Sequence, residues 1–384
     1  MIPIPYGKQE ITDEDITSVI NVLKSDFLTQ GPKVEEFENK FASYIGSKYA
    51  VAVSNGTAAL HLAALSLDVK KGTKVITSPI SFVATANCIE YCGGEITFCD
   101  IDPETLCMDI KELRKILEQS PKGTFQGIIP VDFAGHPIQM DEIRSLANEY
   151  NSWILEDSCH APGGYFFDNK GLNQNCGNGI YADAAIFSFH PVKHIACGEG
   201  GMVTTNDKII YEKLKLYRSH GITKDINKLN NNHGGWYYEM QNLGYNYRLS
   251  DIQCALGISQ LKRGSSNIEK RREIAKNYIR NLNKLPISIP NSNYFDGHAF
   301  HLFVILTDKR NELYHYLREK KIFTQIHYIP IHQMPYYINK YGKQKFNNAE
   351  MYYENCISLP IFPSLSNNDQ SYIIESIKSF YEQI

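Results

Sequence analysis

The strongest constraint on the fold is a regular alternation of short apolar runs with amphipathic helical stretches across the first 207 residues. The runs are rich in β-branched residues and cover 49–54, 74–78, 95–100, 127–132, 153–157, 184–189 and 202–205. Amphipathic stretches such as 58–67, 108–119 and 141–150 lie between most of them. Strands that are apolar on both faces and connected through helices form parallel sheets with helices on both sides. The sequence therefore predicts an α/β fold with a mainly parallel, seven-stranded sheet covered on both faces.

Two helices are predicted ahead of the first strand, and the pattern changes after residue 207. The first, over 12–26, is indicated by Thr12 and Asp15 at capping-box spacing, and the second, over 32–45, has Pro32 in its first turn. Later segments are a helix over 207–220, a loop over 221–244, a long helical stretch over 249–285, a strand over 301–307, a helix over 311–321, a strand over 323–328 and a helix over 369–381. We expect a large domain, 1–250, that includes the N-terminal helical segment, and a smaller C-terminal α/β domain, 251–384, entered through the long helix.

The composition is that of a globular protein, with 43% hydrophobic and 21% charged residues. A formal net charge of −3 gives no support to binding of nucleic acid or an anionic membrane. We find neither a signal peptide nor an apolar run long enough to span a bilayer. The nine cysteines form no Cys-x-x-Cys pair, and the spacing of Cys88 and Cys92 fits two small core residues better than a metal site. We expect reduced thiols, no metal and a cytoplasmic location.

A lysine stands just after one predicted strand, in the segment Ser-Phe-His-Pro-Val-Lys-His (188–194), and Gly-Glu-Gly-Gly (198–201) follows it. An ordered, partly desolvated amine at this place would favour the neutral form that builds a Schiff base with an aldehyde. A lysine in a loop is, on the other hand, usually a solvated surface charge. Lys193 alone therefore does not decide the function. His190 and His194 on either side of it are best interpreted as ordinary polar positions.

A carboxylate ends another predicted strand, Trp-Ile-Leu-Glu-Asp (153–157). Asp157 would then lie at the carboxyl edge of the sheet, where open α/β folds bind their ligands. A cofactor with a pyridine ring needs an acid there, because the protonated ring is the electron sink. Asp157 could equally cap the next turn. His160 could contact such a ring or be an ordinary loop histidine.

A tight turn joins the first strand to its helix at Asn-Gly-Thr (55–57). The free amide groups of a helix N-terminus bind phosphate, and Thr57 supplies a hydroxyl beside them. The segment is neither a P-loop nor a Gly-x-Gly-x-x-Gly fingerprint, which argues against ATP and NAD. A Thr-capped helix without a ligand is the alternative. In this order, a phosphate turn, a strand-end acid and a following lysine indicate an α/β enzyme with a phosphate-bearing ligand.

With these motifs the sequence closely resembles the DegT/DnrJ/EryC1/StrS sugar aminotransferases, which are fold-type I enzymes that use pyridoxal 5′-phosphate (PLP). The resemblance runs from Tyr6 to about Pro363, and its most specific segments are 28–32, 54–60, 156–161, 188–201 and 243–251. It implies that Lys193 forms the Schiff base with PLP and moves protons during the transfer. Asp157 would pair with the pyridine nitrogen, and His160 would lie beside the ring hydroxyl. Phe82 would stack on the ring.

The resemblance also implies how the phosphate is held. Gly56, Thr57 and Ser188 would contact it within one subunit, and Asn246 would reach it from a neighbouring subunit, so the family is expected to form homodimers. Judged from the sequence alone, Asn246 is better explained as a loop residue that caps the following helix.

One subgroup of the family carries histidine in place of the lysine and dehydrates sugars, so Lys193 favours transamination here. The sequence is most similar to the PseC-like enzymes, which aminate C4 of a UDP-linked 4-keto-6-deoxy-N-acetylhexosamine in pseudaminic acid biosynthesis, with glutamate as the expected donor. By this resemblance Tyr6, Thr29, His327 and Tyr328 contact the substrate, although 323–328 also reads as a plain strand. Two alternatives stay open: another nucleotide-linked keto-sugar as substrate, and a PLP-binding regulatory homologue without turnover.

Overall fold

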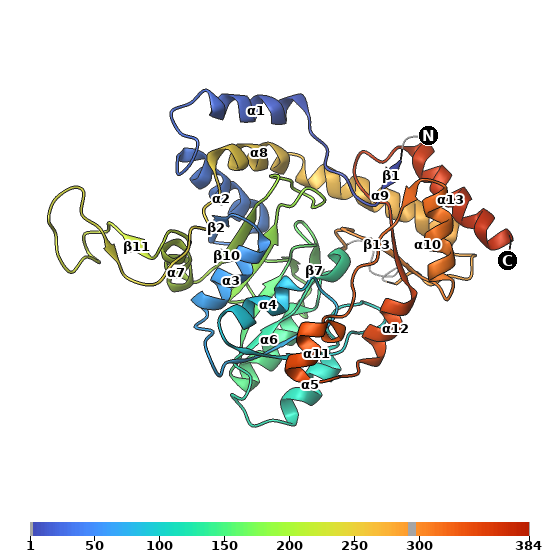
Figure 1. Ribbon diagram of the computed structural model, residues 1–384, viewed down its shortest axis with the longest axis horizontal. Helices are drawn as coiled ribbons and strands as arrows, with labels where there is room; N and C mark the ends of the chain where they lie inside the picture. The colour runs from blue at the N-terminus through green and yellow to red at the C-terminus, as the bar shows by residue number, and fades with distance from the viewer. Residues whose placement is uncertain (1–2, 291–296, 384) are drawn as a thin grey trace.

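The computed structural model describes residues 3–290 and 297–383, and a seven-stranded sheet runs through its larger part (Figure 1). The strands are β2 (Tyr49–Val53), β3 (Lys74–Thr77), β4 (Glu95–Phe98), β5 (Gly127–Ile129), β6 (Trp153–Asp157), β9 (Ala184–Ser188) and β10 (Gly201–Thr205). Their order is β2-β10-β9-β6-β5-β3-β4. Strand β10 is antiparallel to both of its neighbours, and the other pairs are parallel. All seven predicted strands and the mainly parallel α/β sheet are confirmed.

Helices cover both faces of this sheet because successive strand residues point to opposite sides. In β2, Val51 and Val53 pack into a cluster that contains residues of α3 (Gly56–Ser66), α4 (Ala84–Tyr91) and α7 (Lys208–Arg218). Ala50 and Ala52 instead pack into a cluster with Phe37 of α2 (Pro32–Ile45). Strand β2 therefore contributes to two separate cores. This explains why its sequence is apolar throughout and does not alternate.

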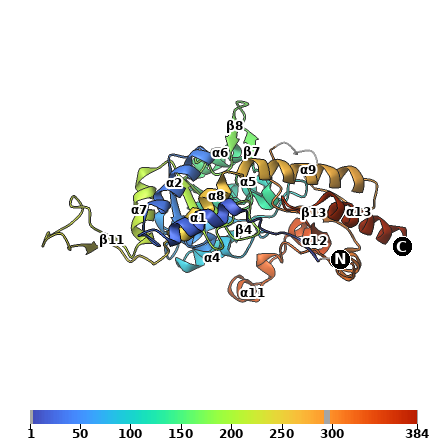
Figure 2. The ribbon, with the colours of Figure 1, turned by 90° about the horizontal axis from the view of Figure 1, so that it is seen from above.

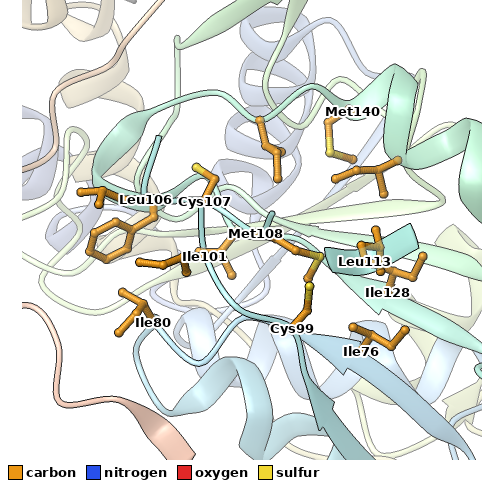
Figure 3. Packing of buried hydrophobic residues seen from close by; sticks show 14 of the residues in the cluster. Ile76, Ile80, Cys99, Ile101, Leu106, Cys107, Met108, Leu113, Ile128 and Met140 are labelled. Atoms are coloured by element: carbon orange, nitrogen blue, oxygen red, sulfur yellow. The ribbon is translucent and has the colours of Figure 1, made fainter. Parts of the chain in front are cut away.

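A third cluster lies over the β3–β5 part of the sheet, beneath α5 (Ile110–Glu118) and α6 (Met140–Tyr150). In Figure 3, Ile76 and Ile128 project from neighbouring strands towards Leu113 of α5 and Met140 of α6. Cys99 is packed among them and is fully buried. The nine cysteines all lie within the described ranges, and none of them is paired in a disulfide.

The N-terminal helix α1 (Asp13–Leu23) is held on α8 (Asp251–Leu261), as Figure 1 shows. Its capping box forms as predicted, with the Asp15 amide bonded to Thr12 Oγ1 and the Thr12 amide bonded to Asp15 Oδ2. Asp15 is fully buried, and its carboxylate accepts hydrogen bonds from Arg263 and from Gln260. A buried carboxylate with these partners ties the two helices together.

The long helical stretch predicted for 249–285 is two helices, α8 and α9 (Gly264–Leu282), separated at residues 262–263. Helix α8 packs on α1 and α2, whereas α9 packs on α13 (Asn367–Glu382). The C-terminal part adds the antiparallel pair β13 (Phe303–Leu306) and β15 (Cys356–Leu359) with α10 (Arg310–Glu319). Strand β1 (Ile4–Pro5) crosses to this part and pairs with β14 (Ile322–Phe323). The domain division at residue 250 stays a prediction.

The predicted strand over 323–328 is wrong beyond Phe323, where β14 ends. Local β-branched and aromatic content favoured a strand, but tertiary contacts redirect the chain into a pocket. Gln325 forms an isolated bridge with Ser358, and the ring of His327 is bonded through Nδ1 to Ser358 Oγ at 2.9 Å. Tyr352 Oη donates to the His327 carbonyl at 2.5 Å. These contacts fix an extended segment without a ladder partner of its own.

Several short elements were not predicted from the sequence. They are the hairpin β7 (Tyr165–Phe167) and β8 (Asn173–Asn175), helices α11 (Pro335–Tyr341) and α12 (Asn347–Asn355), and the two-residue strands β11 (Ile222–Thr223) and β12 (Glu239–Met240). The last two belong to the predicted loop 221–244, which projects from the body as an arm in both views (Figures 1 and 2). Over the described ranges no helix has the length and apolar character needed to cross a bilayer.

Candidate active site

A cavity of about 420 Å³ opens at the carboxyl edge of the sheet, where β6 and β9 end. Ten of the twelve residues predicted for the site line it: Tyr6, Gly56, Thr57, Phe82, Asp157, His160, Ser188, Lys193, His327 and Tyr328. They come from the N-terminal segment, from four strand ends and from the C-terminal part of the chain. The pocket is therefore assembled at the ligand-binding edge expected of an open α/β sheet.

Asp157 ends β6 and is almost fully buried, but its carboxylate has hydrogen-bond donors. Thr85 Oγ1 donates to Oδ2 at 2.7 Å, and the Cys159 amide donates to Oδ1 at 3.2 Å. Ser81 Oγ lies 2.7 Å from Thr85 Oγ1 and, because the Thr85 hydrogen is already used, is the donor of that pair. Asp157 therefore accepts an amide of the next turn, as the capping alternative predicted, and it also lines the cavity at the edge of the sheet. Such donors suit an ionised acceptor.

Helix α3 begins directly at the predicted phosphate turn. Its N-cap is Asn55, whose side chain accepts from the Ala58 amide at 2.8 Å, so the alternative of a Thr-capped helix is wrong. Thr57 is left free to face the cavity, together with the first amides of the helix. A Cβ on Gly56 would lie 3.0 Å from the Ser188 Cβ. The turn therefore sits close against the end of β9 and brings the Ser188 hydroxyl to the same place.

Lys193 is half-buried, so the alternative of a solvated loop lysine is wrong. Its loop turns at once, with the Lys193 amide bonded to the His190 carbonyl at 2.8 Å, and buried Phe189 and Ile195 anchor it on either side. Lys193 Nζ lies 3.4 Å from His301 Nε2. Desolvation lowers the pKa of the amine, which favours its neutral, nucleophilic form.

His160 is held in one tautomer by its neighbours. The Ala134 amide donates to Nδ1 at 3.3 Å, so the hydrogen of the neutral ring is on Nε2, which lies 3.3 Å from Tyr328 Oη. Burial lowers the pKa of His160 well below its usual range, with the nearby Lys193 amine adding to the effect. Phe82 forms the outer wall of the cavity with its ring 6.2 Å from that of Tyr328.

The histidines beside Lys193 occupy different environments. His190 is exposed at the rim of the cavity, whereas His194 is buried and donates from Nε2 to the Ala299 carbonyl at 2.8 Å. His194 is therefore a structural link between the lysine loop and the segment before β13. His327 packs on Tyr6 with 5.0 Å between ring centroids, and burial lowers its pKa to about 3.

Thr29 and Asn246 are the two predicted site residues that the structure does not bring to this cavity. Both are exposed; Thr29 forms an isolated bridge with Ser250, and Asn246 forms one with Ser219. The cap of the helix that follows Asn246 is Ser250, so the interpretation of Asn246 as its cap is wrong. Neither residue therefore lines the pocket of its own chain.

Sequence reasoning missed His301, Thr85 and Ser81. Thr85 and Ser81 flank Phe82 in the segment Ser-Phe-Val-Ala-Thr (81–85), so their spacing around a predicted aromatic was an available signal. His301 had none, because it stands 108 residues from Lys193 and precedes an ordinary strand. Glu199 and Cys159 also line the cavity.

These residues fit PLP group by group. A helix N-terminus with two hydroxyls suits the phosphate, a carboxylate with fixed donors suits the pyridine nitrogen, and a desolvated amine suits the aldehyde. At the phosphate end, a side chain at position 56 would crowd Ser188, so the close packing of the turn depends on glycine. Fold and pocket together define a PLP-dependent transferase of the α/β class.

Comparison with known proteins narrows this class. The DegT/DnrJ/EryC1/StrS aminotransferase family matches residues 9–378, and the chain belongs to this family. The chain is 36% identical over 387 residues to UDP-4-amino-4,6-dideoxy-N-acetyl-beta-L-altrosamine transaminase of Campylobacter jejuni, covering 99% of this chain and 98% of the relative. It is 36% identical over 382 residues to GDP-perosamine synthase of Escherichia coli O157:H7, covering 98% of each. The structure of Helicobacter pylori PseC superposes with a TM-score of 0.90 at 31% identity, covering all of both chains. The chain is thus a sugar aminotransferase, and its cofactor is PLP.

Proposed function

We propose that this enzyme transfers an amino group from an amino acid, glutamate in the first place, to C4 of a UDP-linked 4-keto-6-deoxy-N-acetylhexosamine. The product would enter pseudaminic acid biosynthesis. The observation that carries the catalytic part is the single cavity that holds Lys193, Asp157 and the phosphate turn of α3. The named activities of the Campylobacter jejuni and Helicobacter pylori relatives support the choice of sugar.

PLP, when bound, would supply an aldehyde to take up the amino group and a ring to hold the electron pair left when the donor carbon loses its proton. Lys193 would act as base and then as acid: its neutral amine would accept the proton from the donor carbon that carries the nitrogen and deliver it to the cofactor carbon on the other side of that nitrogen. Asp157 would hold a hydrogen on the pyridine nitrogen, and its own donors Thr85 and Cys159 keep its carboxylate oriented. His160, whose Nε2 lies 3.3 Å from Tyr328 Oη, would contact the ring hydroxyl.

The remaining predicted residues bind and exclude water. Thr57, Ser188 and the first amides of α3 would hold the phosphate, and Phe82 would stack on the ring. Tyr6, His327 and Tyr328 also line the cavity and would contact the sugar or its diphosphate. Burial of His327 keeps its ring neutral above a pH of about 3, so it serves as a hydrogen-bonding group and not as a cation.

We further propose that the enzyme works as a homodimer with shared sites. Asn246 would bind the phosphate in the partner's pocket, and Thr29 would lie beside it. Large exposed apolar side chains on the arm support a docking role: Ile226 is 63% exposed, Trp236 75% and Met240 65%. A cytoplasmic location is also proposed, on the basis of the nine unpaired cysteines.

The test is an absorbance spectrum of the purified protein, first with glutamate and then with the UDP-keto-sugar. The expected result is a visible cofactor band that bleaches with glutamate and returns with the sugar. Lys193→Ala should lose the band and all turnover while keeping its melting temperature. A band that bleaches but returns only with a dTDP- or GDP-linked keto-sugar from a panel would refute the UDP-sugar assignment. A protein that binds PLP but forms no 2-oxoglutarate with any keto-sugar would refute catalysis.

A further inference from the structure

His301 lies against the amine of Lys193, although the two residues come from distant parts of the chain. His301 stands shortly before β13, and Lys193 follows β9. The distance from Lys193 Nζ to His301 Nε2 is 3.4 Å, and His301 is 4% exposed. Its ring also packs on His160, with 4.3 Å between centroids and 35° between planes. His301 is therefore the buried group that directly meets the free end of Lys193.

The position of His301 is set by the backbone around it. Arg271 Nη1 donates to the carbonyls of Phe300 and His301 at 3.1 and 3.3 Å. On the other side is Gly135, with φ +96°, where a Cβ would lie 2.9 Å from the His301 nitrogen and 2.8 Å from the His160 oxygen. The backbones of His160 and His301 therefore both pack closely against the turn at Gly135, where there is no room for a side chain. The His301 ring would keep its place whether or not Lys193 was present.

The surroundings also choose the tautomer of His301. Burial lowers its pKa well below the usual range, so the ring is neutral and carries one hydrogen. Nδ1 is buried and has no hydrogen-bond partner among the described residues. A hydrogen on Nδ1 would be a donor without an acceptor, whereas a hydrogen on Nε2 points at the Lys193 nitrogen. The ring therefore offers an N–H to the lone pair of a neutral amine.

We propose that His301 is a positioning residue for Lys193: its Nε2–H donates to the amine nitrogen whenever that nitrogen is not bonded to the cofactor. The hydrogen bond would hold the free amine inside the pocket during the half of the reaction in which it moves protons. The same hydrogen bond favours the neutral amine over the protonated one, because the ammonium form of Lys193 has no lone pair to accept it. This inference rests on the catalytic role proposed for Lys193.

Other titratable and charged groups near Lys193 and His301 also affect the pKa of Lys193. The titratable and charged groups that face Lys193 or His301 are Asp157, Cys159, His160, His194, Arg271, His327 and Tyr328. Asp157 and Cys159 raise the pKa of Lys193, whereas Arg271 lowers it. A substitution at His301 keeps all of these groups in the chain, including His160 and His194, whose rings pack on that of His301. A change in the titration of Lys193 would then report the lost Nε2 hydrogen bond.

The experiment is competitive acetylation of Lys193 with acetic anhydride, read by mass spectrometry across pH, on full-length enzyme loaded with pyridoxamine phosphate. Removing one donor to the amine in His301→Phe should raise the titration midpoint of Lys193 by about one pH unit. His301→Gln keeps an amide N–H where Nε2 stood and should stay near the wild-type midpoint. His301→Asn places its amide near Nδ1, too far from the amine, and should behave like the phenylalanine variant.

The matched control is His194→Gln, which removes a second buried imidazole that is bonded to Ala299 and not to Lys193. Its Lys193 midpoint should be that of the wild type. An unchanged or lowered midpoint in His301→Phe, or equal midpoints in the Gln and Asn variants, would overturn the proposal. If the phenylalanine variant does not fold, the Gln and Asn pair decides alone. Failure of PLP to protect wild-type Lys193 from acetylation would instead refute the role of Lys193 itself.

Discussion

Asp132 and Glu156 form a buried carboxyl pair behind Asp157, and the pair should make stability depend on pH in an unusual direction. Ser158 Oγ lies 2.8 Å from Asp132 Oδ2 and 2.9 Å from Glu156 Oε1. One hydroxyl has only one hydrogen, so one carboxyl group must supply the other. The Gly177 amide also donates to Glu156 Oε1 at 2.8 Å, and the Ile138 amide donates to Asp132 Oδ1 at 3.1 Å. The geometry thus requires a proton on the pair.

The size of the effect follows from the same burial. Desolvation raises the pKa of Asp132 to about 6, and desolvation together with the charge of Asp132 raises that of Glu156. A folded-state pKa above the unfolded one means that the native state binds the proton more tightly. The stabilisation is complete below the unfolded values near 4 and is lost as the pH rises through 6 and above. A rise of two units corresponds to about 3 kcal/mol.

The perturbation is Glu156→Gln, which replaces the proton-bearing group by a neutral amide of the same size. We expect the melting temperature of wild type to fall between pH 5.5 and 8.5 and that of the variant to fall less. Relative to wild type, the variant should gain about 1–3 kcal/mol over this range. The assay is thermal unfolding by circular dichroism in matched buffers, with the exposed Glu149→Gln as the control. A constant difference between variant and wild type across pH would refute the shared proton.

Three further substitutions probe the pocket. Gly201→Ala should destabilise the fold by about 1–3 kcal/mol and weaken PLP binding. The reason is that its Cβ would lie 2.4 Å from the Asn55 carbonyl oxygen at the phosphate turn. Thermal unfolding measures the first effect, and titration with PLP measures the second. Thr85→Val removes the hydroxyl donor to Asp157 and should weaken PLP binding about 5- to 10-fold, and Thr85→Ser should restore it. Tyr328→Phe should lower kcat with little change in melting temperature, because only the hydroxyl beside the cavity is lost; steady-state kinetics tests this.

The sheet and most of the site could be predicted because their signals are local. Strands such as β2 and β9 are continuous apolar runs, and burial on both faces is what makes such a run. Asp157, Lys193 and Thr57 then follow from one rule, since the carboxyl ends of the strands meet at a common edge. The resemblance to a known family added Phe82, Tyr6 and the histidines.

The remaining features depend on contacts that no local pattern records. Residues 323–328 have strand-like content, yet Ser358 and Tyr352 redirect the chain towards the pocket. His301 meets Lys193 only because the turn at Gly135 joins two segments. Thr29 and Asn246 lie outside the pocket of their own chain, and the roles proposed for them depend on a second copy of the chain.

Burial lowers the pKa of the amine and imidazole groups around this pocket and raises the pKa of the buried carboxyl pair, so both kinds of group favour their neutral forms. It favours the neutral forms of Lys193, His160 and His301, and it also leaves a proton on the carboxyl pair behind the sheet edge. Asp157 differs from that pair in its position, because it lines the cavity, where Thr85 and the Cys159 amide donate to its carboxylate. Burial thus reduces the charge on the groups around the carboxyl group that we propose for the pyridine nitrogen. The neutral amine of Lys193, which lines the same cavity, can then accept a proton.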